Sequence, residues 1–142
     1  MEKFTQDDIP NVAKAIILKA KQTCSVSATL IALSGDLGAG KTTLTQEIAR
    51  QLGVKENVIS PTFVIMKKYE VVDDTFKYLV HIDAYRLEKD EELLKLGWKE
   101  ILEDKNNLVI IEWPESVIGC IPDKVCKVRL SHQDEGTRTV EF

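Results

Sequence analysis

The residues with the clearest capacity for chemistry lie in one glycine-rich stretch, Gly35 to Thr43, with the sequence GDLGAGKTT. Its spacing, a glycine, four residues and then Gly-Lys-Thr, is that of the Walker A phosphate loop. Glycines let the backbone curl so that successive N–H groups face phosphate oxygens, and the following helix adds the positive end of its dipole. Lys41 can reach the β- and γ-phosphates, and the Thr42 hydroxyl can bind Mg²⁺. The stretch therefore predicts a site for a nucleoside triphosphate with magnesium.

The sequence on either side of this stretch has the context that a phosphate loop requires. An apolar run at 28–33 predicts a buried strand before the loop, and helical spacing of apolar residues continues after it to Leu52. The bare pattern arises by chance roughly once in a few hundred chains of this length. The alternative is a glycine-rich turn that joins a strand to a helix without binding a ligand. In that case the apolar run before the loop and the helical pattern after it would accompany the motif only by chance.

Two acidic residues that follow apolar runs are candidates for the rest of the site. Asp83 follows the run VHI, and Glu112 follows the run VII. A phosphate loop needs one acid to hold or orient hydrated Mg²⁺ and one to position the attacking group. Asp83 could equally be a solvated carboxylate that opens a turn. For Glu112, which directly precedes Trp113 and Pro114, the sequence favours a functional role.

Three further residues have both a functional and a structural interpretation, and a fourth has only a structural one. Thr62 could be a switch residue that touches Mg²⁺ or the γ-phosphate, or it could form ordinary loop hydrogen bonds. Trp113 could line the nucleotide pocket or close the edge of the sheet, and we favour the pocket. Arg86 could contact phosphate or pair with a nearby acid. His81 is interpreted as a structural histidine beside the sheet.

The composition is that of an ordinary globular domain. The 142 residues are 44% hydrophobic and 30% charged, with a net charge of −4. We expect one domain over residues 1–142. The apolar runs are too short to cross a bilayer, the acidic start is unlike a signal peptide, and three cysteines without C-x-x-C spacing indicate no disulfide framework. We expect a cytoplasmic protein without membrane contact, and its acidity argues against a broad grip on DNA or other nucleic acid.

The pattern of apolar residues predicts both strands and helices. Helices are predicted over 7–23, 41–52 and 88–102, and strands over 4–5, 28–33, 63–71, 75–82, 108–111, 124–130 and 137–142. We expect an α/β sandwich with a mixed, largely parallel central sheet flanked by helices. If the strands before Gly35, Asp83 and Glu112 run parallel, all three residues lie at one carboxyl edge, where open α/β sheets bind ligands.

Four segments, in this order and spacing, resemble the TsaE family of small bacterial P-loop ATPases of the tRNA threonylcarbamoyladenosine pathway. They are Gly35 to Thr43, Ser60 to Phe63, His81 to Leu87 and Ile111 to Pro114. The first is shared with many nucleotide-binding proteins, whereas the other three are more diagnostic. The resemblance covers nearly the whole chain and implies a single-domain P-loop NTPase-like fold.

The resemblance also implies roles for particular residues. Lys41 would neutralise the phosphates of ATP, and Thr42 and Glu112 would be the Mg²⁺ ligands. Asp83 would be the catalytic acid near the attacking water, and Thr62 would lie in a switch-like segment. The loop residues that would bind the nucleotide are Asp36, Leu37, Gly38, Ala39, Gly40, Lys41, Thr42 and Thr43.

Two segments outside the loop are also implied to meet the nucleotide. One is the N-terminal segment near Asp8, and the other is the late hairpin near Gly136 and Arg138. The family's role is to bind and hydrolyse ATP while engaging the TsaB–TsaD pair, so that the modification complex can turn over repeatedly. The implied activity is therefore a Mg²⁺-dependent ATPase that is slow alone, with tRNA reached only indirectly through the partners.

Three other functions fit the loop itself. A small-molecule kinase of this class needs a substrate-binding insertion and an arginine-bearing lid, whereas this chain has no long insertion and few arginines. A GTP-driven switch usually carries an Asn-Lys-x-Asp segment, which does not occur in the sequence. A nucleotide-gated assembly module without significant hydrolysis overlaps with the favoured interpretation and remains open.

Overall fold

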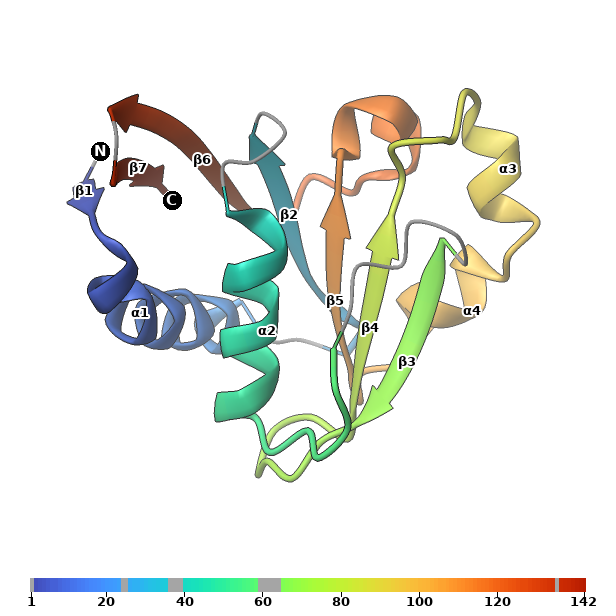
Figure 1. Cartoon of the computed structure of the whole chain (residues 1–142). Helices are drawn as coiled ribbons and strands as arrows, with labels where there is room; N and C mark the ends of the chain where they lie inside the picture. Colours follow the sequence, from blue (N-terminus) through green and yellow to red (C-terminus); the bar gives the residue numbers. More distant parts are fainter. Residues whose placement is uncertain (1, 24–25, 36–39, 59–64, 135) are drawn as a thin grey trace.

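One mixed sheet organises the structure, a computed structural model that describes residues 2–23, 26–35, 40–58, 65–134 and 136–142. Within these residues, seven strands pair in the order β1-β7-β6-β2-β5-β4-β3 (Figure 1). Their bounds are β1 Glu2–Phe4, β2 Thr29–Gly35, β3 Met66–Glu70, β4 Tyr78–Asp83, β5 Asn107–Glu112, β6 Cys126–Asp134 and β7 Thr137–Glu141.

The sheet is mixed, as predicted, but it is parallel only in its four central strands. β6, β2, β5 and β4 run parallel, whereas β1 pairs antiparallel with β7, β7 with β6, and β3 with β4. The prediction of a largely parallel sheet is therefore correct only for these four central strands. The reason is that short turns connect β3 to β4 and β6 to β7, and a short turn permits only antiparallel pairing.

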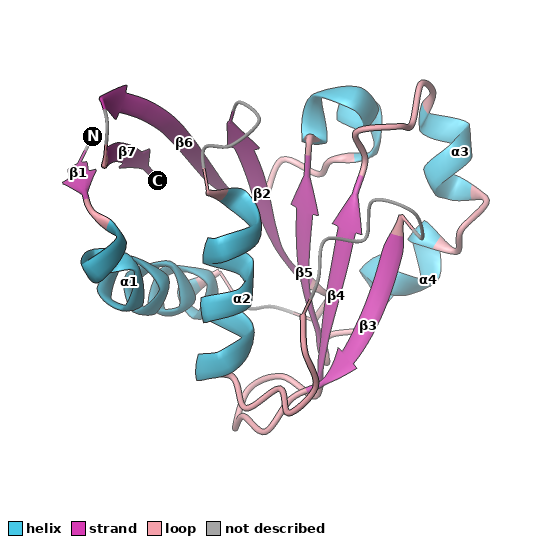
Figure 2. Cartoon of the chain, viewed as in Figure 1, coloured by secondary structure: helices cyan, strands magenta, loops and turns pink. Residues whose placement is uncertain are grey.

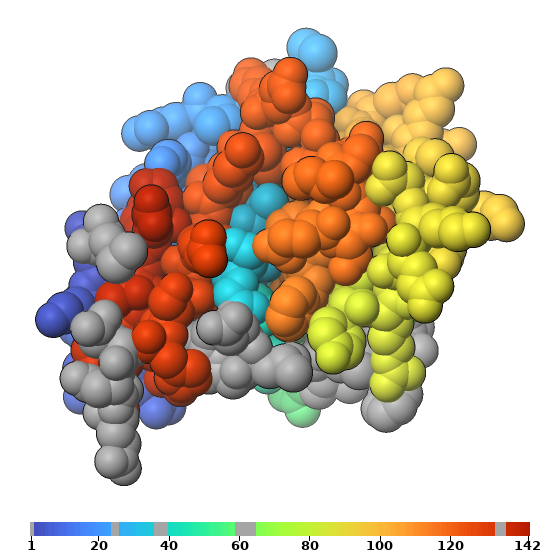
Figure 3. All heavy atoms as spheres, turned by 90° about the horizontal axis from the view of Figure 1, so that it is seen from above, coloured from blue at the N-terminus to red at the C-terminus, as the bar shows by residue number. Residues whose placement is uncertain are grey.

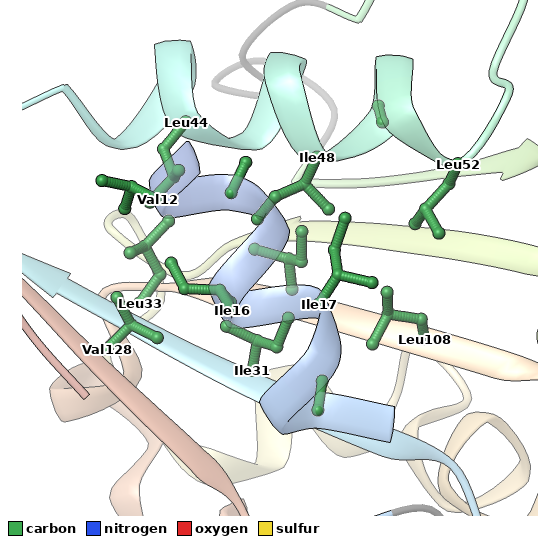
Figure 4. Packing of buried hydrophobic residues seen from close by; sticks show 14 of the residues in the cluster. Val12, Ile16, Ile17, Ile31, Leu33, Leu44, Ile48, Leu52, Leu108 and Val128 are labelled. Carbon is green, nitrogen blue, oxygen red and sulfur yellow. The ribbon is translucent and has the colours of Figure 1, made fainter. Parts of the chain in front are cut away.

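Two helices, α1 Ile9–Gln22 and α2 Lys41–Gln51, cover one face of the sheet (Figures 1 and 2). A short 3₁₀ turn, η1 Gln6–Asp8, leads into α1. Leu44 and Ile48 lie four residues apart on α2 and pack with Ile16 of α1 and Leu33 of β2 in one buried cluster (Figure 4). This packing fixes the start of α2 near the end of β2.

The opposite face is covered by α3 Asp90–Leu94, α4 Trp98–Glu103 and a 3₁₀ segment, η2 Pro114–Cys120. The single helix predicted over 88–102 is wrong, because Gly97 adopts a left-handed conformation with φ +87° and separates α3 from α4. Trp98 is buried, and its indole N–H donates to the Cys120 carbonyl at 3.0 Å. None of the helices in the described ranges is long and apolar enough to cross a membrane.

An ion pair ties α1 to the β3–β4 turn. The Lys21 ammonium donates to Asp73 Oδ1 at 2.9 Å, and the backbone N–H groups of Thr75 and Phe76 donate to Asp73 Oδ2. Burial acts to raise the pKa of Asp73, but these hydrogen bonds outweigh burial, so the pKa lies below its usual value of 3.8. Asp74 also contacts Lys21, at 3.3 Å, from a far more exposed position.

We expect Asp73→Asn to lower the free energy of unfolding by about 1 kcal/mol at pH 7, because the amide keeps an acceptor oxygen but loses the charge. An acid with a depressed folded pKa stabilises the protein above its unfolded pKa, and this contribution disappears as pH falls through the folded value. The decrease in unfolding free energy caused by Asp73→Asn should therefore be smaller at pH 3 than at pH 7, as measured by urea denaturation. Asp74→Asn is the matched control, with a smaller expected loss. Equal losses for Asp73→Asn at both pH values would contradict the electrostatic explanation.

Candidate functional site

The strand register brings the two predicted acids together at one end of the sheet. Glu112 of β5 pairs with Asp83 of β4 on one side and with Leu33 of β2 on the other. All three strands run parallel, so their carboxyl ends share one edge with Gly35, the last residue of β2. Seen from above this edge, the cyan residues of β2 lie between the orange residues that follow β5 and the redder residues of β6 (Figure 3). The predicted common edge is therefore present.

The acids face the side of the sheet that α1 and α2 cover. Side chains alternate along a strand, so Asp83 and His81 point to the same face as Leu79, which packs in the cluster beneath these two helices. Asp83 is 8% exposed and Glu112 is 3% exposed. Burying ionised carboxylates costs free energy, and such groups are concentrated at functional sites.

Lys41, the first residue of α2, lies beside the same edge. Its side chain is 6% exposed, and Nζ donates to the Gly35 carbonyl at 2.5 Å. The ammonium also lies 4.3 Å from the ring centroid of Trp113, which directly follows β5. Lys41 thus contacts the end of β2 and the residue after β5 from the start of a helix.

Trp113 is held in an unusual conformation at this edge. Its φ of +57° is left-handed, a strained region for a residue with a side chain. Its ring lies 5.1 Å from that of Tyr85, centroid to centroid, at an interplanar angle of 53°. Trp113 is half-buried and Tyr85 is exposed, so the two rings form an aromatic wall at the rim.

Asp83 has the electrostatic character of a proton acceptor. Burial raises its pKa above the usual value, and the charge of Glu112 raises it further. The backbone N–H of Tyr85, which donates to Asp83 Oδ1 at 3.0 Å, and the charge of Lys41 act in the opposite direction without cancelling the rise. A carboxylate with a raised pKa accepts a proton more readily at neutral pH.

His81 is the residue whose place in the site the sequence analysis missed. It was expected to be structural, and it is indeed buried, with 0% exposure, but its Nε2 lies 2.5 Å from Glu112 Oε2. The available signal was its spacing of two residues from Asp83, which places both side chains on one face of a strand.

Of the residues predicted to meet the nucleotide from the N-terminal segment and the late hairpin, Arg138 lies beside the start of α2, whereas Asp8 and Gly136 are exposed. A Cβ on Gly40 would lie 3.6 Å from Cδ and Nε of Arg138, so β7 reaches the start of α2. Asp8 is exposed, and its carboxylate accepts hydrogen bonds from Thr5. Gly136 lies in the β6–β7 turn with φ +81° and is exposed. A small cavity of about 80 Å³ is lined by Phe4, Gln6, Ile9, Gly40, Thr43, Leu44 and Arg138.

Several predicted site residues lie outside the described residues. They are Asp36, Leu37, Gly38 and Ala39 in the loop, together with Thr62. Thr42, the second residue of α2, is partly buried, and Thr43 is exposed.

The donor set at this edge fits a Mg²⁺ site that a ligand completes. Across the part of the chain that the structure describes, no group of three or more His, Cys, Asp and Glu residues could hold a metal ion. Mg²⁺ typically keeps several waters and binds one or two carboxylates together with substrate phosphates. The Glu112 carboxylate and the Thr42 hydroxyl could supply such a partial set, and the Lys41 ammonium could bind the phosphates.

Fold and site together define an α/β protein. Its charged candidate site residues lie at the carboxyl ends of parallel strands, where such sheets bind ligands. The family model described as "Threonylcarbamoyl adenosine biosynthesis protein TsaE" matches residues 5–140. The chain therefore belongs to the TsaE family.

Individual relatives agree with this assignment. A Nostoc protein named "tRNA threonylcarbamoyladenosine biosynthesis protein TsaE" is 39% identical over 119 residues, which are 82% of this chain and 70% of that protein. A Rickettsia felis protein of the same name is 38% identical over 110 residues, 77% of this chain but only 61% of the relative's length. The crystal structure of Bacillus subtilis YdiB superposes with a TM-score of 0.69 at 27% identity, covering 98% of this chain and 80% of that one.

Proposed function

We propose that this chain is the ATP-binding subunit of a machinery that makes threonylcarbamoyladenosine in tRNA. In this proposal the fold is P-loop NTPase-like, and Mg–ATP binds at the edge where β2, β4 and β5 end. The observation that carries the proposal is the convergence of Lys41 with the buried acids Asp83 and Glu112 at that edge. Membership of the TsaE family supports the pathway.

The proposed chemistry assigns one task to each group. Lys41 would turn from the Gly35 carbonyl to the β- and γ-phosphates, because a charged acceptor makes a stronger hydrogen bond than a neutral one. Glu112 and Thr42 would hold Mg²⁺, which when bound neutralises charge on the phosphate oxygens. Asp83 would orient the attacking water and take up its proton, as its raised pKa favours.

We propose that hydrolysis is slow in the isolated chain and is coupled to the partner proteins TsaB and TsaD. A positive group supplied by a partner accelerates phosphoryl transfer by about 10³–10⁵-fold in proteins that lack one of their own. The net charge of −4 supports a role in which the partners hold the tRNA and this chain meets it only indirectly.

Calorimetric titration with ATP, combined with phosphate-release assays, tests this proposal. We expect Mg²⁺-dependent ATP binding that GTP competes with poorly, slow phosphate release by the chain alone, and a change in that rate when TsaB and TsaD are both added. Undetectable ATP binding would contradict the proposal. Stoichiometric phosphorylation of an added nucleoside or sugar would favour a small-molecule kinase instead.

A further inference from the structure

His81 and Glu112 form a buried polar pair, and the proposed chemistry gives a role to Glu112 but none to His81. His81 Nε2 and Glu112 Oε2 lie 2.5 Å apart, with side-chain exposures of 0% and 4%. A carboxylate that binds a metal ion is ionised and only accepts hydrogen bonds, so Nε2 is the donor of this contact in a metal-binding form. The other ring nitrogen, Nδ1, is buried without a hydrogen-bond partner among the described residues. The contact with Glu112 is therefore the polar interaction that sets the orientation of this ring.

Both groups lie within the sheet layer, away from solvent. His81 pairs in register with Ile110 and lies between the buried Leu79 and Asp83 on its own strand face. On the other side of β4, His81 pairs in register with Lys67 of β3, whose ammonium lies over the ring of Tyr69. Oε2 of Glu112 is occupied by His81, whereas Oε1 accepts no hydrogen bond within the described ranges. One carboxylate oxygen is anchored inside the sheet layer, and the second remains available.

We propose that His81 is a positioning residue, which anchors one oxygen of Glu112 so that the other is presented to Mg²⁺ at the edge of the sheet. This inference rests on the proposed function, because it needs Mg–ATP to bind there. Metal ligands commonly depend on such an outer partner, and removing the partner typically lowers metal affinity or activity about 10–100-fold. A purely structural pair would instead affect folding stability and leave metal dependence unchanged.

The test compares substitutions that differ in whether they can reach Glu112. His81→Gln extends an N–H donor to about the distance of Nε2, His81→Asn is polar but shorter, and His81→Leu lacks a donor. For each folded variant, ATP affinity is measured over a range of Mg²⁺ concentrations and again in EDTA. The same substitutions are made in a Glu112→Gln background, and thermal melting monitors folding throughout.

We expect His81→Leu and His81→Asn to raise the Mg²⁺ concentration for half-saturation about 10–100-fold. His81→Gln should stay near the wild-type value, and affinity in EDTA should change little in all three. In the Glu112→Gln background, His81→Leu should add almost no further shift, because the group that it positions is already altered. If His81→Leu does not fold, the Gln and Asn pair carries the comparison.

Any of three outcomes would overturn the inference while the proposed function stands. One is an unchanged Mg²⁺ half-saturation in folded Leu and Asn variants of a protein that binds Mg–ATP. The second is a loss of affinity that is as large in EDTA as in Mg²⁺, and the third is a loss that adds fully to the effect of Glu112→Gln. A wild-type chain without Mg²⁺-dependent ATP binding would instead refute the proposed function, and the inference would fall with it.

Discussion

Replacing Lys41 with alanine is expected to weaken ATP binding at least about thirtyfold, which corresponds to about 2 kcal/mol. The substitution removes a charged donor whose Nζ lies beside the Gly35 carbonyl and the Trp113 ring at the proposed phosphate site. A hydrogen bond from a cation to a phosphate is roughly twice as strong as a neutral one, and it has no substitute in alanine. Calorimetry with Mg–ATP measures the effect directly.

Lys14→Ala is a suitable control, because Lys14 is an exposed lysine on α1. It removes the same charge from the protein at a distance from the edge, so any general effect of net charge appears in both variants. We expect Lys14→Ala to bind ATP like the wild type. An affinity within threefold of wild type for folded Lys41→Ala would show that the phosphates bind elsewhere.

The second large effect is expected from Asp83→Asn, which should slow ATP hydrolysis about 100–1,000-fold and leave ATP affinity within a few-fold. The amide can still accept the hydrogen bond from the Tyr85 N–H, but it cannot take a proton from the attacking water. Single-turnover hydrolysis and equilibrium binding separate the two effects. Equal losses in both would identify Asp83 as a ligand of the nucleotide or metal.

The raised pKa of Asp83 adds a stability prediction that also serves as a folding control. The folded state holds the Asp83 proton more tightly than the unfolded chain, because burial and Glu112 disfavour the charge. The contribution of this group to stability therefore rises as pH falls through the raised pKa, and the ionised form costs stability at neutral pH. Asp83→Asn should be at least as stable as wild type at pH 7. Any fall of the wild-type hydrolysis rate at acidic pH that comes from protonation of Asp83 should be absent in this variant.

Local patterns in the sequence were sufficient for most of the elements. The aliphatic run at 108–111 predicted the central strand β5, and the glycine-rich loop predicted where β2 gives way to α2. The break at Gly97 was missed because Leu93, Leu94, Trp98 and Ile101 keep helical spacing on both sides of it. A single glycine in a helical pattern lowers helix propensity by only about 1 kcal/mol, which does not decide the conformation.

The geometry of the site depends on information that no local pattern holds. The pairing of His81 with Glu112 follows from the register between β4 and β5, which are separated in the sequence by two helices. Register is set by the whole buried face rather than by the residues at the strand ends. The left-handed backbone of Trp113 likewise has no signal in its residue type, since aromatic residues rarely adopt it.

A crystal structure with Mn²⁺ and a non-hydrolysable ATP analogue, with the metal located by its anomalous scattering, tests the central claim most directly. The account predicts one Mn²⁺ ion between the phosphates and Glu112, with Thr42 as a further ligand, Lys41 on the phosphates and Asp83 facing the γ-phosphate. A metal ion bound away from Glu112, or either acid turned away from the triphosphate, would contradict it.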